Sequence, residues 1–243
     1  MQEIEFLVPN KNSFKKEIYW LVLTAIFLAF AILIEWISLS FKFYFLSFNI
    51  SLFIVFFTFY LIDLKHTILL LLLKFIIVSI LQPGIIVLSF LGNFVGLLFQ
   101  LIFILCFALV IKLFYKRNQN QNKNPSIQKH LVILNLMFSP SFVIIQLVLI
   151  LLNTFLINPI YFKVFGIIDS ASYNAIKEVY LTKSLNTYFF GIKNYFWASF
   201  IFYFTFNSLN FFINIIIINL LMVLEYKTKF FTRMVSTINQ HKY

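Results

Sequence analysis

Side-chain amides inside apolar stretches are the residues of this sequence best suited to binding a small molecule. Asn153 lies near the end of one such stretch, in the segment LLNTFLINP, and Asn207 lies inside the last one. An amide in hydrocarbon is costly without a hydrogen-bond partner, so both should face protein, water or a ligand. Two buried amides on two late helices suggest a small polar ligand held between them. The alternative is that they only join helices by hydrogen bonds.

The motifs of several enzyme classes are missing from the sequence. There is no phosphate-binding G-x-x-x-x-G-K-[ST] loop, no H-E-x-x-H pair and no G-x-S-x-G elbow, and His66, His130 and His241 are far apart. Cys106 is the only cysteine, which excludes an internal disulfide and a cysteine-rich metal site. We therefore expect no enzyme activity and no metal site. If the protein transports a substrate uphill, another subunit must supply the energy.

The composition is that of a membrane protein. Of the 243 residues, 62% are hydrophobic and only 11% are charged, and the mean hydropathy is +0.95, whereas about a quarter of a soluble domain is charged. The abundant Phe, Ile, Asn, Lys and Tyr have AT-rich codons, which indicates an AT-rich genome. The net charge is +11, and nearly all of the Lys and Arg residues lie between and beyond the apolar runs. The orientation of the chain in a membrane explains this distribution, so no nucleic-acid partner is expected.

Six apolar runs predict an all-α integral membrane protein with six transmembrane helices, in a single domain over residues 1–243. A basic linker is expected at 112–129, and an amphiphilic outer loop, able to hold a surface helix or a lid, at 159–193. In this arrangement 13 of the 19 Lys and Arg residues lie on the side of both termini and five on the other, which predicts cytoplasmic N and C termini. The expected helices are 18–39, 50–62, 67–81, 85–113, 131–157 and 194–224.

The start of the chain and the end of the fifth helix each have a recognisable sequence pattern. Residues 1–16 are polar and lack the pattern of a cleavable signal peptide, so the first helix should remain in the mature protein. Pro159 is expected to stop the fifth helix, because proline cannot continue the helical hydrogen-bond ladder.

Two ionisable residues fall within the predicted helices. Glu35 lies near the outer end of the first helix and is expected to reach the water interface by snorkelling. Lys74 lies inside the third helix and either snorkels or faces a polar interior. Both are expected to have structural roles.

Small residues and aromatic residues mark further contacts. Ala25 with Ala29, and Gly92 with Gly96, place two small residues four apart on one helix face, which predicts close helix contacts. The segment at 40–49 is too aromatic for an ordinary solvated loop, so it should lie on the membrane surface or over a cavity.

The six-helix layout and five short segments resemble the S components of energy-coupling-factor (ECF) vitamin transporters, and most of all the riboflavin-binding members. The resemblance covers about residues 18 to 225. It is carried, in chain order, by Ala25-x-x-x-Ala29, the aromatic linker into Asn49-Ile50-Ser51, Leu91-Gly92-Asn93-Phe94, Leu152-Asn153-Thr154-Phe155 with Pro159-Ile160-Tyr161, and Phe206-Asn207.

The resemblance implies a substrate-capture subunit of an ABC-type importer in the cell membrane. Such subunits bind a water-soluble vitamin near the outer face and dock through small residues, here Ala25 and Ala29, onto a transmembrane coupling subunit. Two ABC-type ATPases then drive uptake. Riboflavin or a related vitamin is the transported ligand, and no other cofactor is expected. The residues implied to contact it are Phe43, Tyr44, Leu46, Asn93, Asn153, Asn207 and Asn210.

Two positions depart from the riboflavin-binding pattern. Asn210 stands where those members tend to have lysine, and Asn49 stands where they tend to have an acid. Another water-soluble vitamin therefore stays open as the ligand. The alternatives to a capture subunit are a membrane enzyme or assembly factor without vitamin binding, and a facilitator that works without partners.

Overall fold

A computed structural model describes residues 14–82, 85–117, 127–230 and 233. The described chain is almost entirely helical: α1 (Phe14–Ser38), α2 (Leu52–Leu61), α3 (Leu64–Leu81), α4 (Ile86–Arg117), α5 (Ile127–Leu152), α6 (Asn158–Val164), α7 (Tyr173–Val179) and α8 (Tyr195–Thr228). Two-residue strands, β1 (Lys42–Phe43) and β2 (Leu46–Ser47), form its one small sheet. Residues 118–126 of the predicted linker at 112–129 lie outside the described residues, α4 extends over its start, and α5 begins before its end.

Five of these helical segments are long and apolar enough to cross a membrane, which confirms a multi-pass all-α membrane protein. They are Glu17–Ser38, Leu64–Leu81, Ile86–Leu113, Leu131–Val164 and Tyr195–Thr228. The predicted helix at 50–62 corresponds to α2, which has only ten residues. At 1.5 Å per residue it is about 15 Å long, roughly half of a 30 Å hydrocarbon layer.

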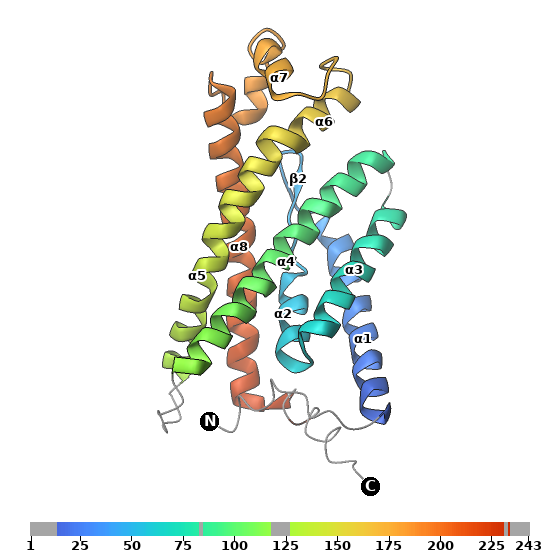
Figure 1. Cartoon of the computed structure of the whole chain (residues 1–243), viewed down its shortest axis with the longest axis vertical. Coiled ribbons are helices and arrows are strands. Elements are labelled where there is room, and N and C mark those ends of the chain that lie inside the picture. Colours follow the sequence, from blue (N-terminus) through green and yellow to red (C-terminus); the bar gives the residue numbers. More distant parts are fainter. Residues whose placement is uncertain (1–13, 83–84, 118–126, 231–232, 234–243) are drawn as a thin grey trace.

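An irregular segment occupies the space above α2. Figure 1 shows the chain descending from the β hairpin into α2 in the middle of the bundle. The strands pair Lys42 with Ser47 and Phe43 with Leu46 through a two-residue turn, in which Tyr44 has a left-handed φ of 56°. The predicted aromatic linker thus folds back into the bundle between α1 and α2.

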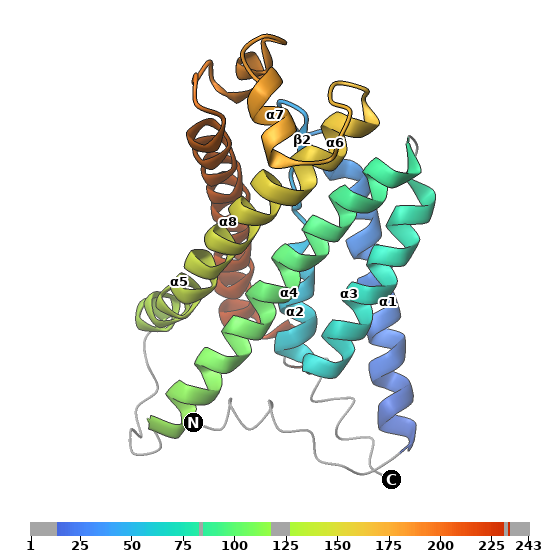
Figure 2. The ribbon, with the colours of Figure 1, turned by 45° about the horizontal axis from the view of Figure 1, so that its top comes forward.

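The long helices form two groups joined by α4. Helix α3 packs against α1 and α2, α8 packs against α5 and α2, and α4 contacts both α3 and α5. Figure 2 shows α4 crossing the bundle diagonally between these groups. Rings fill the centre, where Phe56, Phe103, Phe107 and Phe138 pack with centroids 5.0–6.3 Å apart.

The prediction that Pro159 ends the fifth helix is wrong. The helix passes through a π-helical turn at Asn153–Ile157 and continues as α6 to Val164. In the π turn the backbone N–H of Asn158 donates to the carbonyl of Asn153, one residue further back than in an α-helix. Proline is tolerated in the first turn of a helix, and Pro159 is the second residue of α6, which follows this change of register.

The segment at 159–193, called the cap below, is folded rather than extended. It contains α6, α7 and a short 3-10 turn at Leu185–Phe189. Ile176, Tyr180 and Phe189 of the cap are buried in a second apolar cluster with Tyr195 and Phe202 of α8. In Figure 1 α7 lies over the upper end of α8.

Candidate functional site

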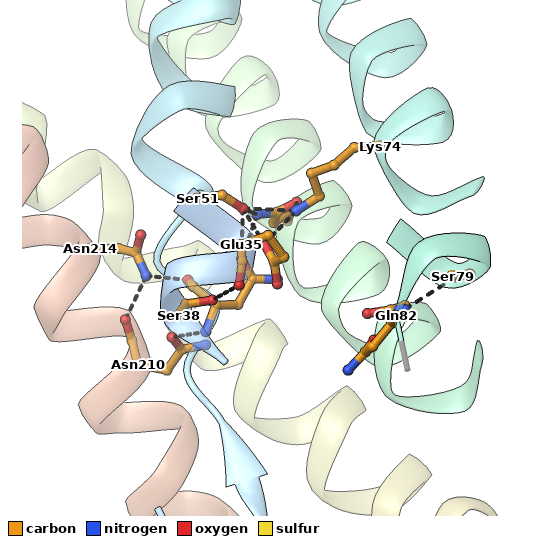
Figure 3. Close-up of polar contacts among 11 residues, drawn as sticks. Glu35, Ser38, Ser51, Lys74, Ser79, Gln82, Asn210 and Asn214 are labelled. Carbon is orange, nitrogen blue, oxygen red and sulfur yellow. Dashed lines mark hydrogen bonds and ion pairs between the residues drawn. The ribbon is translucent and has the colours of Figure 1, made fainter. Parts of the chain in front are cut away.

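A buried ion pair lies in the interior of the bundle. The Lys74 ammonium on α3 donates to Glu35 Oε2 on α1 at 3.0 Å, as Figure 3 shows. The Lys74 and Glu35 side chains are only 6% and 12% exposed. The prediction that Glu35 snorkels to water is therefore wrong, because its carboxylate turns inward to a charged partner.

Two further groups complete the shell of Lys74. Its ammonium also donates to Ser51 Oγ and to Gln100 Oε1, both at 2.8 Å. An ammonium has three protons, so all of them are used within the protein. Gln100 in turn donates to Ser51 Oγ at 2.9 Å and to Asn49 Oδ1 at 2.6 Å. The cluster has no net charge and joins α1, α3 and α4 to the loop that precedes α2.

Helix α8 secures the same loop through side-chain amides. The backbone N–H of Asn49 donates to Asn210 Oδ1 at 3.0 Å, and Asn214 Nδ2 donates to the backbone carbonyl of Asn49 at 2.8 Å. Backbone groups at membrane depth must find partners inside the protein. Asn210 and Asn214 supply those partners where the chain is not helical (Figure 3).

Gly96 provides room for the side chain of Asn49. A Cβ atom at Gly96 would lie 2.8 Å from Asn49 Nδ2, closer than real contacts allow, whereas one at Gly92 would lie 3.3 Å from the Tyr161 hydroxyl. That hydroxyl donates to the carbonyl of Leu88 at 3.0 Å. The two glycines thus admit polar side chains from other segments, a detail that the small-residue spacing does not reveal.

Three asparagines follow one another along the buried face of α8. Asn207, Asn210 and Asn214 are 2%, 4% and 0% exposed. Among the described residues, four buried side-chain atoms have no hydrogen-bond partner, and only the first of them is a donor: Asn207 Nδ2, Asn214 Oδ1, Asn219 Oδ1 and Gln146 Oε1. Such atoms are costly in a protein interior, so each calls for an explanation.

The other predicted amides have partners within the protein. Asn153 Nδ2 donates to the carbonyl of Leu149 in its own helix at 2.8 Å. Asn93 Nδ2 donates to Gln82 Oε1 at 2.9 Å and to Ser79 Oγ at 3.3 Å, linking α4 to the end of α3. Their contact with a ligand stays a prediction.

The hairpin residues pack against α8 and the cap. The Phe43 ring lies 5.6 Å from Phe202 and 6.1 Å from Phe206, and the Tyr44 ring lies 5.7 Å from Phe202. Leu46 is half-buried against the second apolar cluster. The hairpin therefore forms an aromatic layer beside the upper part of α8.

A second buried polar group lies at the π turn. The Asn158 side chain bridges the hydroxyls of Tyr195 and Tyr203: Nδ2 donates to Tyr195 at 3.2 Å, and Oδ1 accepts from Tyr203. The Tyr195 hydroxyl donates to the carbonyl of Thr154 at 3.0 Å. Sequence analysis missed this group, because Tyr195 and Tyr203 lie 37 and 45 residues from Asn158 along the chain. The one available signal was that Asn158 is a second asparagine close to Asn153 in the same apolar run.

The predicted docking residues lie on the outside of the bundle. Ala25 and Ala29 are exposed on α1, the least buried of the five candidate spans. Within the described part of the chain, no three His, Cys, Asp or Glu side chains gather as a metal site would require.

The chemistry available in this region is hydrogen bonding and ring stacking. The Lys74 cluster uses its donors internally, which leaves the buried N–H group of Asn207, beside the aromatic layer, as the group best suited to meet a ligand.

Comparisons with protein-family models, with curated proteins and with solved structures found no match to this chain.

Proposed function

We propose that this protein is the substrate-capture subunit, or S component, of an ECF-type importer that binds a water-soluble vitamin, with riboflavin favoured. A transmembrane coupling subunit and two ABC-type ATPases supply the energy. The chain resides in the cell membrane of a bacterium and crosses it six times, with α2 and the hairpin above it forming the second crossing. The asymmetry of Lys and Arg then puts both termini in the cytoplasm.

The unpartnered amide N–H group of Asn207 is the observation that carries this proposal. The neighbouring Phe206 stacks on Phe48 with ring centroids 5.5 Å apart and an interplanar angle of 26°. A flat vitamin ring has faces that stack on such rings and carbonyl groups at its edge that accept a hydrogen bond. A ring inserted beside Phe48 and Phe206 therefore offers Asn207 the acceptor it lacks.

The hydrogen bonds divide the predicted ligand set by role. Asn207 is assigned to the ligand, whereas Asn210 positions the loop at Asn49 and reaches the ligand only through that loop. Phe43 and Tyr44 cover the ring from the hairpin. In this assignment the asparagine at 210 suits the site better than a lysine, because Asn210 must accept a bond from a backbone N–H group.

The exposed face of α1 supports the proposed partner. Ile18, Val22, Ala25, Ala29 and Leu33 are exposed and recur at the spacing of one helix face. The two alanines make a shallow place in this apolar ridge, where another helix can approach closely in the membrane.

The ligand is tested with the purified protein in mild detergent. The preparation is denatured and released small molecules are identified by absorbance and mass spectrometry, and riboflavin binding is then measured by quenching of flavin fluorescence. Asn207→Leu should weaken binding about 5- to 100-fold, since leaving a buried partner unsatisfied costs roughly 1–3 kcal/mol. The matched control is Asn219→Leu, which removes an α8 amide bonded to Asn135 and should leave the affinity within about twofold.

The outcomes separate the candidate functions. Equal loss in both variants would count against a ligand at Asn207. A colourless protein that releases another vitamin changes the substrate and keeps the class. A protein that releases and binds no vitamin contradicts the proposal and favours a membrane enzyme or assembly factor.

The partner is tested by co-purification with the coupling subunit and ATPases. Ala25→Trp with Ala29→Trp should abolish the complex, because two indoles fill the shallow part of the α1 ridge. Leu147→Trp, on the exposed face of α5, is the control and should leave the complex intact. A complex that survives the alanine changes contradicts docking through α1.

A further inference from the structure

A cleft of about 330 Å³ opens between α7 and the start of α8. Tyr173 and Lys177 line it from α7, Lys193 from the segment entering α8, and Tyr195 and Trp197 from the first turn of α8. Its size is at the lower end of the roughly 300–1,000 Å³ typical of small-molecule pockets. The cleft is separate from the Lys74 cluster and shares no residue with the proposed vitamin site.

The charge of the cleft is positive. Lys177 and Lys193 line it, whereas its lining includes no Asp or Glu. Neither lysine forms an ion pair with another described residue. The cap as a whole carries four lysines and two acids. Two ammonium groups without an acidic partner, both lining one cleft, favour an anion.

The position of the cleft indicates that its ligand also has an apolar part. Tyr195 begins a helix long and apolar enough to cross the membrane, so the first turn of α8 lies at the level of lipid headgroups. Trp197 is 55% exposed there, and Ile201 and Phe204 continue the same exposed ridge down α8. A ligand with an anionic head and an apolar chain matches both the lysines and the ridge.

We propose that this cleft binds a phosphate ester, supplied by the headgroup of an anionic lipid in the leaflet next to α7. The phosphate lies between Lys177 and Lys193, the glycerol packs on the rings of Tyr173 and Trp197, and an acyl chain follows the ridge of α8. A water-soluble phosphate ester has the same phosphate group but no acyl chain to pack on the ridge of α8. This inference does not depend on vitamin capture.

The test uses Trp197 as the reporter. Trp20→Phe with Trp36→Phe leaves Trp197 as the only tryptophan of the full chain. The protein is placed in nanodiscs of phosphatidylcholine that contain increasing fractions of brominated phosphatidylglycerol or, in parallel, brominated phosphatidylcholine. Quenching should saturate at a much lower fraction of the brominated phosphatidylglycerol. Lys177→Gln with Lys193→Gln should weaken that preference about 20- to 30-fold, since a lysine near an anionic surface contributes roughly 1 kcal/mol.

The control for charge alone is Lys163→Gln, which removes an exposed cap lysine outside the cleft. It should change the lipid preference much less than the double lysine variant. Glycerol phosphate is titrated against Trp197 emission in neutral detergent, where saturable binding lost in the double lysine variant identifies a soluble ester as the ligand. Equal quenching by both brominated lipids, together with no response to glycerol phosphate, overturns the proposal. If the single-tryptophan protein does not purify as one species, the same titrations use Trp36→Phe alone, because Trp20 is buried whereas Trp36 is 49% exposed.

Discussion

Replacing Lys74 by methionine should destabilise the protein strongly, and much of that loss should disappear when Glu35 is changed as well. The Lys74 ammonium donates to Glu35, Ser51 and Gln100 at 3.0, 2.8 and 2.8 Å. Methionine fills nearly the same space without a donor. In Lys74→Met the Glu35 carboxylate is therefore left buried without its cation, whereas Glu35→Gln in the double variant removes that charge.

The expected size of the effect follows from these bonds. A hydrogen bond to a charged group contributes about 1.5–3 kcal/mol net, so three contribute roughly 4.5–9 kcal/mol. The lysine no longer has to be taken out of water, which offsets part of this sum, and breaking one side of a buried pair costs about 3–5 kcal/mol. We expect a loss of about 3–5 kcal/mol for Lys74→Met, a smaller loss for Glu35→Gln, and a coupling energy of roughly 2 kcal/mol between them.

Unfolding by SDS in mixed micelles, followed by far-ultraviolet circular dichroism, measures the four proteins of this cycle. Lys65→Met is the control, because Lys65 is exposed on the same helix and its loss should cost no more than about 0.5 kcal/mol. Additive losses, with a coupling below about 0.5 kcal/mol, would refute the view that the two side chains act as a buried pair.

Three further predictions use the same unfolding assay or a pH titration. Gly96→Ala should cost about 1–3 kcal/mol by displacing Asn49, whereas Gly92→Ala should cost clearly less; equal losses contradict the close contact. Asn158→Leu should cost roughly 2–4 kcal/mol, because two buried tyrosine hydroxyls lose their shared partner, and a neutral result contradicts the bridge. Burial raises the pKa of Tyr180 to about 12, so the folded cap keeps a proton that the unfolded chain releases near pH 10. The stability of the cap should therefore fall between about pH 10 and 12. This fall should be smaller in Tyr180→Phe, and an identical pH profile in that variant contradicts the prediction.

The long helices could be predicted from the sequence because their signal is local. An uninterrupted apolar run has to span the membrane, and its length is read directly from the chain. The fifth run shows the limit of this reasoning. Proline normally ends a helix, but the π turn before Pro159 changes the hydrogen-bond register, and no local pattern announces such a turn.

The interior of the site could not be predicted because its contacts join distant segments. Glu35 and Lys74 are 39 residues apart and lie on different helices, so each in isolation resembles a snorkelling side chain. The presence of one acid and one base, each within an apolar run, was a usable signal for a pair. The bonds from Asn49 to Asn210 and Asn214 depend on how α8 meets the loop, which only the packed bundle determines.

The attachment of the Asn49 loop to α8 has a consequence for how the protein is made. The partners of Asn49 lie 161 and 165 residues further along the chain. At about 5–20 residues per second of synthesis, they follow the loop by roughly 8–30 s. During that interval the earlier helices have entered the membrane while the loop lacks its final acceptor and donor. The insertion of α8 therefore completes the fold. A nascent chain that ends before Asn210 is incompletely folded and exposed to membrane quality control.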